Sequence, residues 1–300
     1  MPERAHNPTA GILWMLLTGA LFVAVIGIVK HLGSALPAAE SAFLRYALGL
    51  VFLLPMIGPI LRARLSRRDI GLFAARGLAH TLGVFLWFFA MTRIPMAEVT
   101  AVGYLSPVFV TIGAALFLGE RLAARRLLAI GAALAGAMVI LRPGFREISS
   151  GHLAILANGV LFGASYLIAK LMSGRVGPAV VVGMLSITVT IGLAPLAAAV
   201  WITPTAEQLG WIFLVACFAT AGHYTMTLAF QVAPITVTQP VTFLQLVWST
   251  LLGAVLFSEP VDGWVIFGGA IIIAAISFIT WREAVLKRQY ITPAPPATKL

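Results

Sequence analysis

The stretch AMTRIPMAEVTAVGYLSPVFVTIGAALFLGE, residues 90–120, aligns without a gap to AFQVAPITVTQPVTFLQLVWSTLLGAVLFSE, residues 229–259. Both copies carry a proline near the start, a threonine in the last third and a glutamate at the end. The matched positions include Ala90 with Ala229, Pro95 with Pro234, Leu105 with Leu244, Thr111 with Thr250 and Glu120 with Glu259. This pattern predicts that the chain arose by duplication.

Outward from these stretches the chain is strongly apolar. It has 300 residues, of which 60% are hydrophobic and 10% charged, whereas soluble domains carry about 25% charge. A helix that crosses a bilayer needs about 20 apolar residues. Ten runs meet this need: 11–30, 38–60, 70–92, 97–118, 127–142, 152–172, 180–201, 210–230, 237–257 and 263–281. The sequence therefore predicts an all-α polytopic membrane protein that is embedded in a lipid bilayer.

The duplication divides these ten spans into two sets of five. Because five is odd, the second set must cross the membrane in the opposite direction, and inverted repeats are typical of alternating-access carriers. We expect a tail at 1–10, a first repeat at 11–145, a second repeat at 146–283 and a tail at 284–300. A duplicated scaffold that transports nothing is the alternative.

The net charge of +10 is distributed unevenly, so it indicates orientation and not binding to nucleic acid. Basic residues gather in the segments that share a side with the amino terminus, such as Arg62, Arg64, Arg67 and Arg68. This places both termini in the cytoplasm and the protein in a bacterial-type inner membrane. The sequence favours no oligomeric state. Cys217 is the only cysteine, so no intramolecular disulfide can form.

Several motifs together resemble one known family. They are FLRYALGL in the second span, IPMAEVTAVGYLSPVF at the entry to the fourth, LGERL at its exit and LRPG after the fifth. With the five-plus-five plan, they resemble the EamA family of the drug/metabolite transporter superfamily. The second half departs from the pattern, because FSEP stands where a Gly-Glu pair is expected. The resemblance implies an exporter or importer of amino acids, S-adenosylmethionine, riboflavin or other metabolites.

Polar side chains recur at helical spacing in several spans, and we expect them to face a central cavity and not lipid. The candidate substrate-binding residues are Trp14, His80, Trp87, Tyr104, Asn158, Phe162, Tyr166, His223, Tyr224, Thr227, Gln245 and Trp248. Their aromatic rings suit apolar or aromatic cargo. Pro107 is the expected hinge, since proline removes a helical hydrogen bond.

Each of these assignments has a structural alternative. Serine and threonine also form hydrogen bonds between helices, and the serines and threonines of these polar faces are expected to do so. A histidine such as His80 can be a neutral core residue instead of a ligand or proton carrier. Trp201, Trp211, Trp264 and Trp281 fit the interfacial belt instead of a cavity.

Charged residues inside spans are few. All ten acidic residues lie in tails, loops or the first and last turns of spans, which argues against a carboxylate relay and leaves coupling to the histidines or downhill exchange. Glu98 is expected to cap its helix by interacting with the helix dipole. Arg45 and Arg76 are expected to extend toward the nearer interface; the alternative is that Arg76 binds a substrate carboxylate. Neither a metal nor a cofactor is predicted.

These features predict a secondary carrier for small metabolites that works by alternating access. The preferred cargo is an amino acid with an aromatic or other apolar side chain, moved outward. The alternative is the import of a metabolite such as riboflavin or S-adenosylmethionine. A membrane-embedded enzyme would need a catalytic constellation that the spans lack, and a scaffold would show no saturable flux.

Overall fold

The computed structural model describes residues 7–33, 35–119, 124–172, 176–233 and 235–291. Nearly all of them are helical. The helices are α1 (Pro8–Leu32), α2 (Ala38–Gly49), the 3-10 helix η1 (Leu50–Met56), α3 (Ile57–Arg62), α4 (Arg67–Met91), α5 (Met96–Gly103), α6 (Ser106–Leu118), α7 (Ala124–Leu141), α8 (Ser150–Met172), α9 (Pro178–Ala198), α10 (Ala206–Val232), α11 (Ile235–Thr242), α12 (Leu244–Phe257) and α13 (Gly263–Ile291).

Within the described residues, ten segments are long and apolar enough to cross a membrane, which confirms the predicted all-α architecture. The boundaries differ from the expected ones by a few residues, most clearly at the two ends of the bundle. The first helix begins at Pro8 because the side chain of Asn7 accepts a hydrogen bond from the backbone of Ala10 at 3.0 Å and proline suits the first helical turn. The last helix continues to Ile291, beyond the expected boundary at residue 283. Glu120 and the outer parts of both tails lie outside the described residues.

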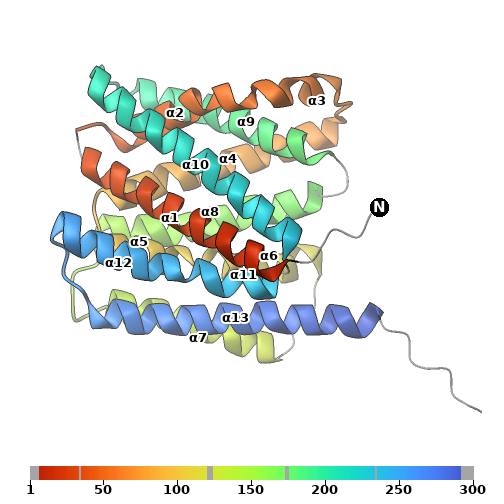
Figure 1. Ribbon diagram of the computed structural model, residues 1–300, viewed down its shortest axis with the longest axis vertical. Coiled ribbons are helices and arrows are strands. Elements are labelled where there is room, and N and C mark those ends of the chain that lie inside the picture. The colour runs from red at the N-terminus through yellow and green to blue at the C-terminus, as the bar shows by residue number, and fades with distance from the viewer. Residues whose placement is uncertain (1–6, 34, 120–123, 173–175, 234, 292–300) are drawn as a thin grey trace, which may run out of the picture.

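The helices lie roughly parallel or antiparallel, with the start of α1 and the end of α13 at the same end of the bundle (Figure 1). We call this the terminal end, and the opposite end, where α1 ends and α5, α8 and α13 begin, the distal end. Matching spans of the two halves run in opposite directions: α4 runs toward the distal end and α10 away from it (Figure 1). The main neighbours are α1 with α10, α4 with α8, and α7 with α13.

The fourth and ninth spans are each broken in the middle, at aligned positions. In the fourth span α5 ends at Gly103 and α6 begins at Ser106. Pro107 has no N–H to donate to the carbonyl of Gly103, and the hydroxyl of Ser106 donates to that carbonyl instead, at 3.1 Å. In the ninth span α11 and α12 are separated by Phe243 alone, three residues after Pro240.

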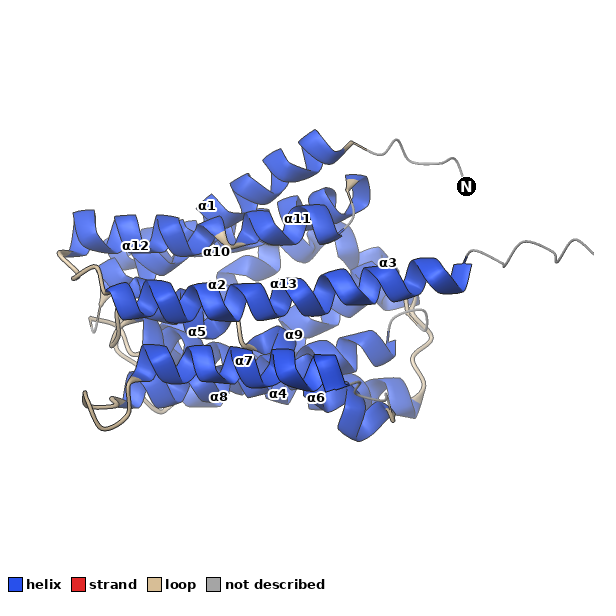
Figure 2. Ribbon diagram, turned by 90° about the horizontal axis from the view of Figure 1, so that it is seen from below, coloured by secondary structure: helices blue, strands red, loops and turns tan. Residues whose placement is uncertain are grey.

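Two glycines bring α7 and α13 into backbone contact. A Cβ atom added to Gly136 would lie 2.7 Å from the carbonyl oxygen of Gly268, and one added to Gly268 would lie 2.5 Å from the carbonyl oxygen of Gly136. Only residues without a side chain allow this approach. Figure 2 shows α7 and α13 side by side on the face toward the viewer, which is the lower edge of the bundle in Figure 1.

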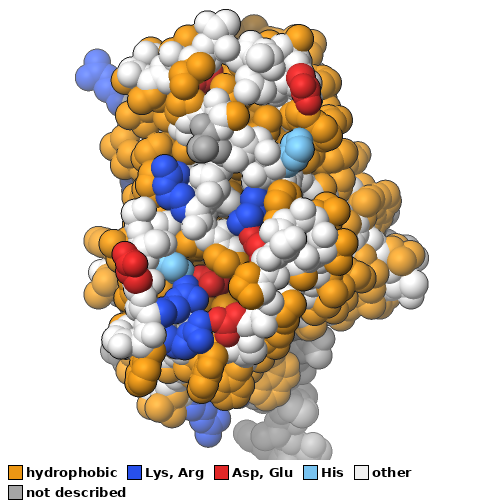
Figure 3. Space-filling model, turned by 90° about the vertical axis from the view of Figure 1, so that its left-hand side faces the viewer, with side chains coloured by type: hydrophobic (Ala, Val, Ile, Leu, Met, Phe, Trp, Pro, Cys, Tyr) orange, Lys and Arg blue, Asp and Glu red, His pale blue; other side chains and the backbone are white. Residues whose placement is uncertain are grey.

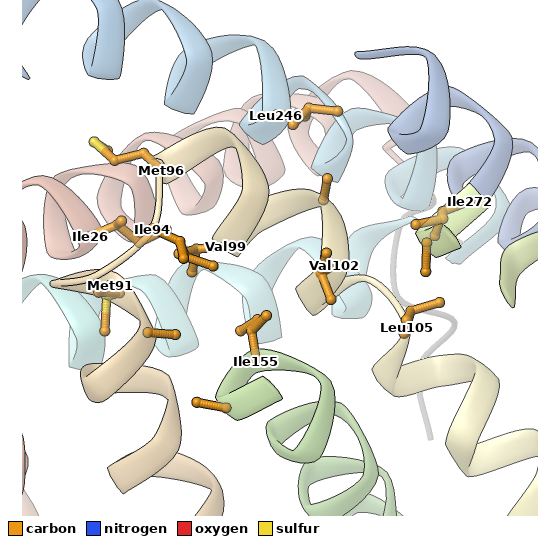
Figure 4. Close-up of a cluster of buried hydrophobic side chains, with 14 of the residues drawn as sticks. Ile26, Met91, Ile94, Met96, Val99, Val102, Leu105, Ile155, Leu246 and Ile272 are labelled. Atoms are coloured by element: carbon orange, nitrogen blue, oxygen red, sulfur yellow. The ribbon is translucent and has the colours of Figure 1, made fainter. Parts of the chain in front are cut away.

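The apolar core fills the distal half of the bundle. Figure 4 shows side chains from six helices converging there, and Ile26, Met91, Met96 and Ile155 are fully or almost fully buried. They come from α1, α4, the start of α5 and the start of α8. These side chains pack the described distal half of the bundle.

Candidate functional site

Three aromatic side chains from α4 and α8 form a group at the middle of the bundle. The rings of His80 and Phe162 are stacked, with centroids 4.7 Å apart, and the rings of Phe162 and Tyr166 lie 5.9 Å apart. His80 Nδ1 and the Ser165 hydroxyl are 3.1 Å apart, within hydrogen-bond distance. We call His80, Phe162 and Tyr166 the central aromatic group.

Local sequence explains why α4 and α8 approach closely enough to form this group. Gly83 lies against Phe162, and a Cβ atom at Gly83 would come within 2.6 Å of the ring. The carbonyl of Gly83 accepts a hydrogen bond from the side chain of Asn158 at 2.9 Å. Asn158 is fully buried. Its side chain therefore joins two helices and does not face a cavity.

The central aromatic group borders a cavity. Tyr166 has 43% of its surface accessible, and its ring centroid lies 6.5 Å from that of His80. His223 on α10 is also exposed, lies within electrostatic range of His80, and packs its ring edge-on against Phe22 with centroids 5.1 Å apart. We infer that these two accessible side chains border a common cavity in the terminal half of the bundle.

Two arginines place positive charge beside this cavity. Arg76 of α4 is 7% exposed, and its Nη1 donates to the carbonyl of Val181 at 3.0 Å. Arg45 of α2 lies over the ring of Tyr46, with its guanidinium carbon 4.0 Å from the centroid. The charges of both arginines act on His80, and that of Arg45 also acts on His223. Arg76 extends toward the nearer end, as expected, but α9 covers it and it does not reach solvent.

Tyr104 lies at the junction between the two broken spans. Its hydroxyl donates to the carbonyl of Thr242 at 3.0 Å, and its ring packs edge-on against Phe243, with centroids 5.3 Å apart. Tyr104 and Phe243 are aligned positions of the two sequence repeats. The contact therefore joins the two breaks directly to each other.

Replacing Tyr104 by Phe should change the rate of transport more than the affinity. The variant keeps the ring and loses one hydrogen bond between the breaks, which corresponds to about a 2- to 10-fold change in kcat. We expect KM to change less than about twofold in a liposome flux assay, since the hydroxyl donates to protein and not to cargo. A raised KM with unchanged kcat would contradict this and would support a direct contact with cargo.

The remaining candidates lie apart from the central aromatic group or contact their own helix. Trp87 packs edge-on against Phe88, and the hydroxyl of Thr227 donates to the carbonyl of His223 at 2.9 Å. Tyr224 is 65% exposed. Trp14 and Trp248 are exposed, Gln245 is half-buried, and Pro107 is exposed at the start of α6. The binding roles of these residues and the hinge role of Pro107 stay predictions.

A network of ion pairs closes the distal end, and Glu98 is at its centre. Both carboxylate oxygens of Glu98 accept hydrogen bonds from Arg146, at 3.0 and 2.6 Å, and one also accepts from His152 Nε2 at 2.6 Å. Glu98 is 3% exposed and lies in the first turn of α5, as predicted, but its side chain does not cap that helix. The hydrogen bond to Glu98 raises the pKa of Arg146 above its usual value. The distal ion-pair network is thus centred on a buried carboxylate.

His152 is held by contacts at both ring nitrogens. The backbone N–H of Ser149 donates to His152 Nδ1 at 3.0 Å. Nε2 lies 2.6 Å from a carboxylate oxygen of Glu98 and also contacts Arg146 Nη2. His152 therefore joins the start of α8 to the start of α5.

Two further ion pairs complete the closure. Lys30 pairs with Glu259, whose other oxygen accepts from the backbone of Met96 at 2.9 Å, and Arg142 pairs with Asp262. Figure 3 shows basic, acidic and histidine side chains gathered on the distal end between apolar flanks. A surface cavity of about 340 Å³ lies at this end, and its lining includes Glu98, Arg146, His152 and Asp262.

Sequence reasoning missed most of this arrangement. His152 was not singled out, and Arg146 and Glu98 are 48 residues apart, so no local pattern links them. The signal that could have found them is the scarcity of charge, since a charged residue in so apolar a chain needs a partner. Arg45 and Arg76 are also charged residues within apolar spans, so the scarcity of charge singles them out in the same way.

A bundle of ten apolar spans with a polar and aromatic cavity at mid-depth, closed at one end, is the architecture of a multi-pass membrane transporter. The model of the EamA-like transporter family matches residues 9–142 and again residues 149–281. The chain belongs to the EamA-like transporter family.

Characterised relatives extend over almost the whole chain. A riboflavin transporter of Rhizobium johnstonii is 31% identical over 94% of this chain and 93% of its own length, and one of Vibrio cholerae is 28% identical over 95% and 97%. The pseudopaline exporter of Pseudomonas aeruginosa is 27% identical over 89% and 94%. A crystal structure that is 20% identical superposes with a TM-score of 0.60 over 97% of this chain and all of that chain, which shows a shared fold. The protein is a transporter of small molecules.

Proposed function

We propose that this transporter is a secondary carrier that moves a small aromatic metabolite through alternating access. The observation that carries the proposal is the pair of accessible side chains, Tyr166 and His223, beside two arginines that form no ion pair with any described residue. Aromatic faces bind flat rings, and a cavity at mid-membrane between two halves is where carriers bind their cargo.

One contact supports an inverted-repeat mechanism. Tyr104 meets its aligned partner Phe243. Equivalent residues contact each other when they lie on a two-fold axis. The family model also matches each half separately. An axis through this contact would allow the two halves to exchange conformations, opening the distal end as the terminal end closes.

Riboflavin, taken inward, is the cargo that we propose to test first. Two of the relatives that match over more than nine-tenths of this chain are named as riboflavin transporters. The tricyclic ring of riboflavin could stack on Tyr166 and Phe162. The positive charge of Arg45 and Arg76 disfavours a cationic cargo such as S-adenosylmethionine.

Outward transport of aromatic and other apolar amino acids is the second candidate. The observation that favours it is the guanidinium of Arg76 near Tyr166, because a carboxylate beside an aromatic ring would match both groups. The pseudopaline exporter among the relatives shows that export occurs in similar chains.

Flux into liposomes tests the proposal. Purified protein is reconstituted, and uptake of labelled riboflavin and labelled tryptophan is measured against protein-free liposomes. We expect saturable uptake of one of them, with competition by the unlabelled compound. Flux that rises linearly with concentration and ignores competitors would contradict a carrier. Growth of a riboflavin-requiring bacterium at low external riboflavin would then establish import.

The cell membrane and its sidedness belong to the same proposal. The excess of arginine at the terminal end, including Arg62, Arg64, Arg67 and Arg68, supports cytoplasmic termini in an inner membrane. The distal ion-pair network would then face the outside. Cleavage of a tag on the carboxyl terminus by protease added to intact cells would contradict this orientation.

A further inference from the structure

Arg76 is a buried cation without a counter-ion. Nη1 donates to the carbonyl of Val181, while Nε is buried and has no hydrogen-bond partner. Among the described residues no carboxylate forms an ion pair with it. The half-buried cations of the distal end, Lys30, Arg142 and Arg146, all pair with acids.

A buried guanidinium without an ion pair lowers the stability of the fold, so stability does not explain why it is there. A guanidinium stays charged at every relevant pH, and burying a charge without a partner costs free energy. The bond to Val181 does not explain the charge, because a neutral donor such as an amide could make it. A charge that the fold leaves without a partner is available for a bound molecule.

The residues around Arg76 indicate which chemical groups the bound molecule carries. The Arg76 guanidinium lies within electrostatic range of Tyr166 and Tyr46, and of His80 with its stacked ring. Arg45 adds a second cation without an ion pair on the neighbouring helix α2. An aromatic wall thus borders two positive charges with no acid among the described residues beside them.

We propose that Arg76, with Arg45, forms a specificity-determining subsite of the central cavity that binds acceptor oxygens attached to or beside an aromatic ring and excludes cations. The oxygens are those of a carboxylate in an aromatic acid or the paired carbonyls of a flavin ring. The ring lies against Tyr166 and Phe162, and the guanidinium of Arg76 donates to the oxygen. This inference rests on the proposed function and specifies its cargo chemistry.

The test measures binding and flux for the parent protein and Arg76→Gln. The probes are riboflavin, tryptophan and tryptamine, which keeps the indole ring but carries an amine and no carboxylate. Parent protein should bind riboflavin or tryptophan and reject tryptamine. In Arg76→Gln the affinity for that cargo should fall about 10- to 100-fold, because a charged hydrogen bond is lost, and tryptamine should become a competitor. Whether riboflavin or tryptophan loses affinity distinguishes the flavin carbonyls from the carboxylate.

Matched variants separate this subsite from a structural role. Arg125→Gln removes an exposed arginine at the terminal end of α7 and should leave binding unchanged. Glutamine at position 76 can still donate to Val181, so a purely structural arginine predicts unchanged affinity and continued rejection of tryptamine. That result in a folded variant would overturn the subsite while leaving the carrier proposal intact.

Two other outcomes are also decisive. If Arg76→Gln does not fold, Arg45→Gln is measured in the same way, and its half-buried side chain makes folding less dependent on it. Unchanged affinity and unchanged exclusion of tryptamine in Arg45→Gln would then overturn the subsite. If the parent protein binds neither riboflavin nor tryptophan, the proposed function fails first, and the subsite fails with it.

Discussion

Replacing Glu98 by Ala should destabilise the protein more than any other single change at the distal end. The substitution leaves Arg146 and His152 without their shared acceptor in a site where Glu98 is almost fully buried. Breaking a buried ion pair from one side costs about 3 kcal/mol or more. We expect the melting temperature in detergent to fall by roughly 5–10 °C, measured by fluorescence-detected size-exclusion chromatography after heating.

Glu147→Ala is the matched control for this change. Glu147 is the adjacent residue to Arg146 and is exposed, so its removal should shift the melting temperature by no more than about 1–2 °C. The double variant Glu98→Gln/Arg146→Gln should melt above Glu98→Ala, because neither charge is then left alone. If Glu98→Ala melts with the parent protein, the distal ion-pair network does not stabilise the closed end.

Replacing Tyr166 by Ala should weaken binding of cargo about 10- to 100-fold, since a ring that lines the cavity contributes about 1.5–3 kcal/mol through the surface it covers. The effect on folding should be small because 43% of Tyr166 is accessible in the absence of cargo. Equilibrium binding by the purified protein and KM in liposomes both measure it.

Two control variants test whether the loss of affinity comes from the ring of Tyr166 itself. Tyr166→Phe keeps the ring and should bind within about threefold of the parent protein if ring contact dominates. Trp281→Ala removes an exposed aromatic side chain at the terminal end of α13 and should not alter binding. Equal affinities in the parent protein and Tyr166→Ala would place the cargo elsewhere.

The fold was predictable because the length of each apolar run and the repeat of five spans can both be read directly from the sequence. Ten spans follow from composition, and the prolines at 107 and 240 indicate where regular helix is interrupted. The hydrogen bond from Thr100 to Ser249, at 2.8 Å, confirms the expectation that small hydroxyl residues join helices.

The candidate site was less predictable, for a geometrical reason. Helical spacing places residues on one face but does not tell whether that face meets a cavity or a neighbouring helix. Asn158 and Phe162 share a stripe, yet Asn158 is sealed against Gly83 while Phe162 stacks on His80. The role of Glu98 was misjudged because its partners come from another loop and another helix, so their approach depends on the tertiary fold.

The glycine contact between α7 and α13 has a consequence for how the protein is made. The ribosome completes α7 about 120 residues before α13 begins, which at 5–20 residues per second leaves roughly 6–25 s between them. During that time the face of α7 around Gly136 has no partner. Nascent chains therefore pass through a stage in which the first half is inserted but α7 lacks its partner. A stop codon before α13 would make this stage permanent and expose the chain to membrane proteases.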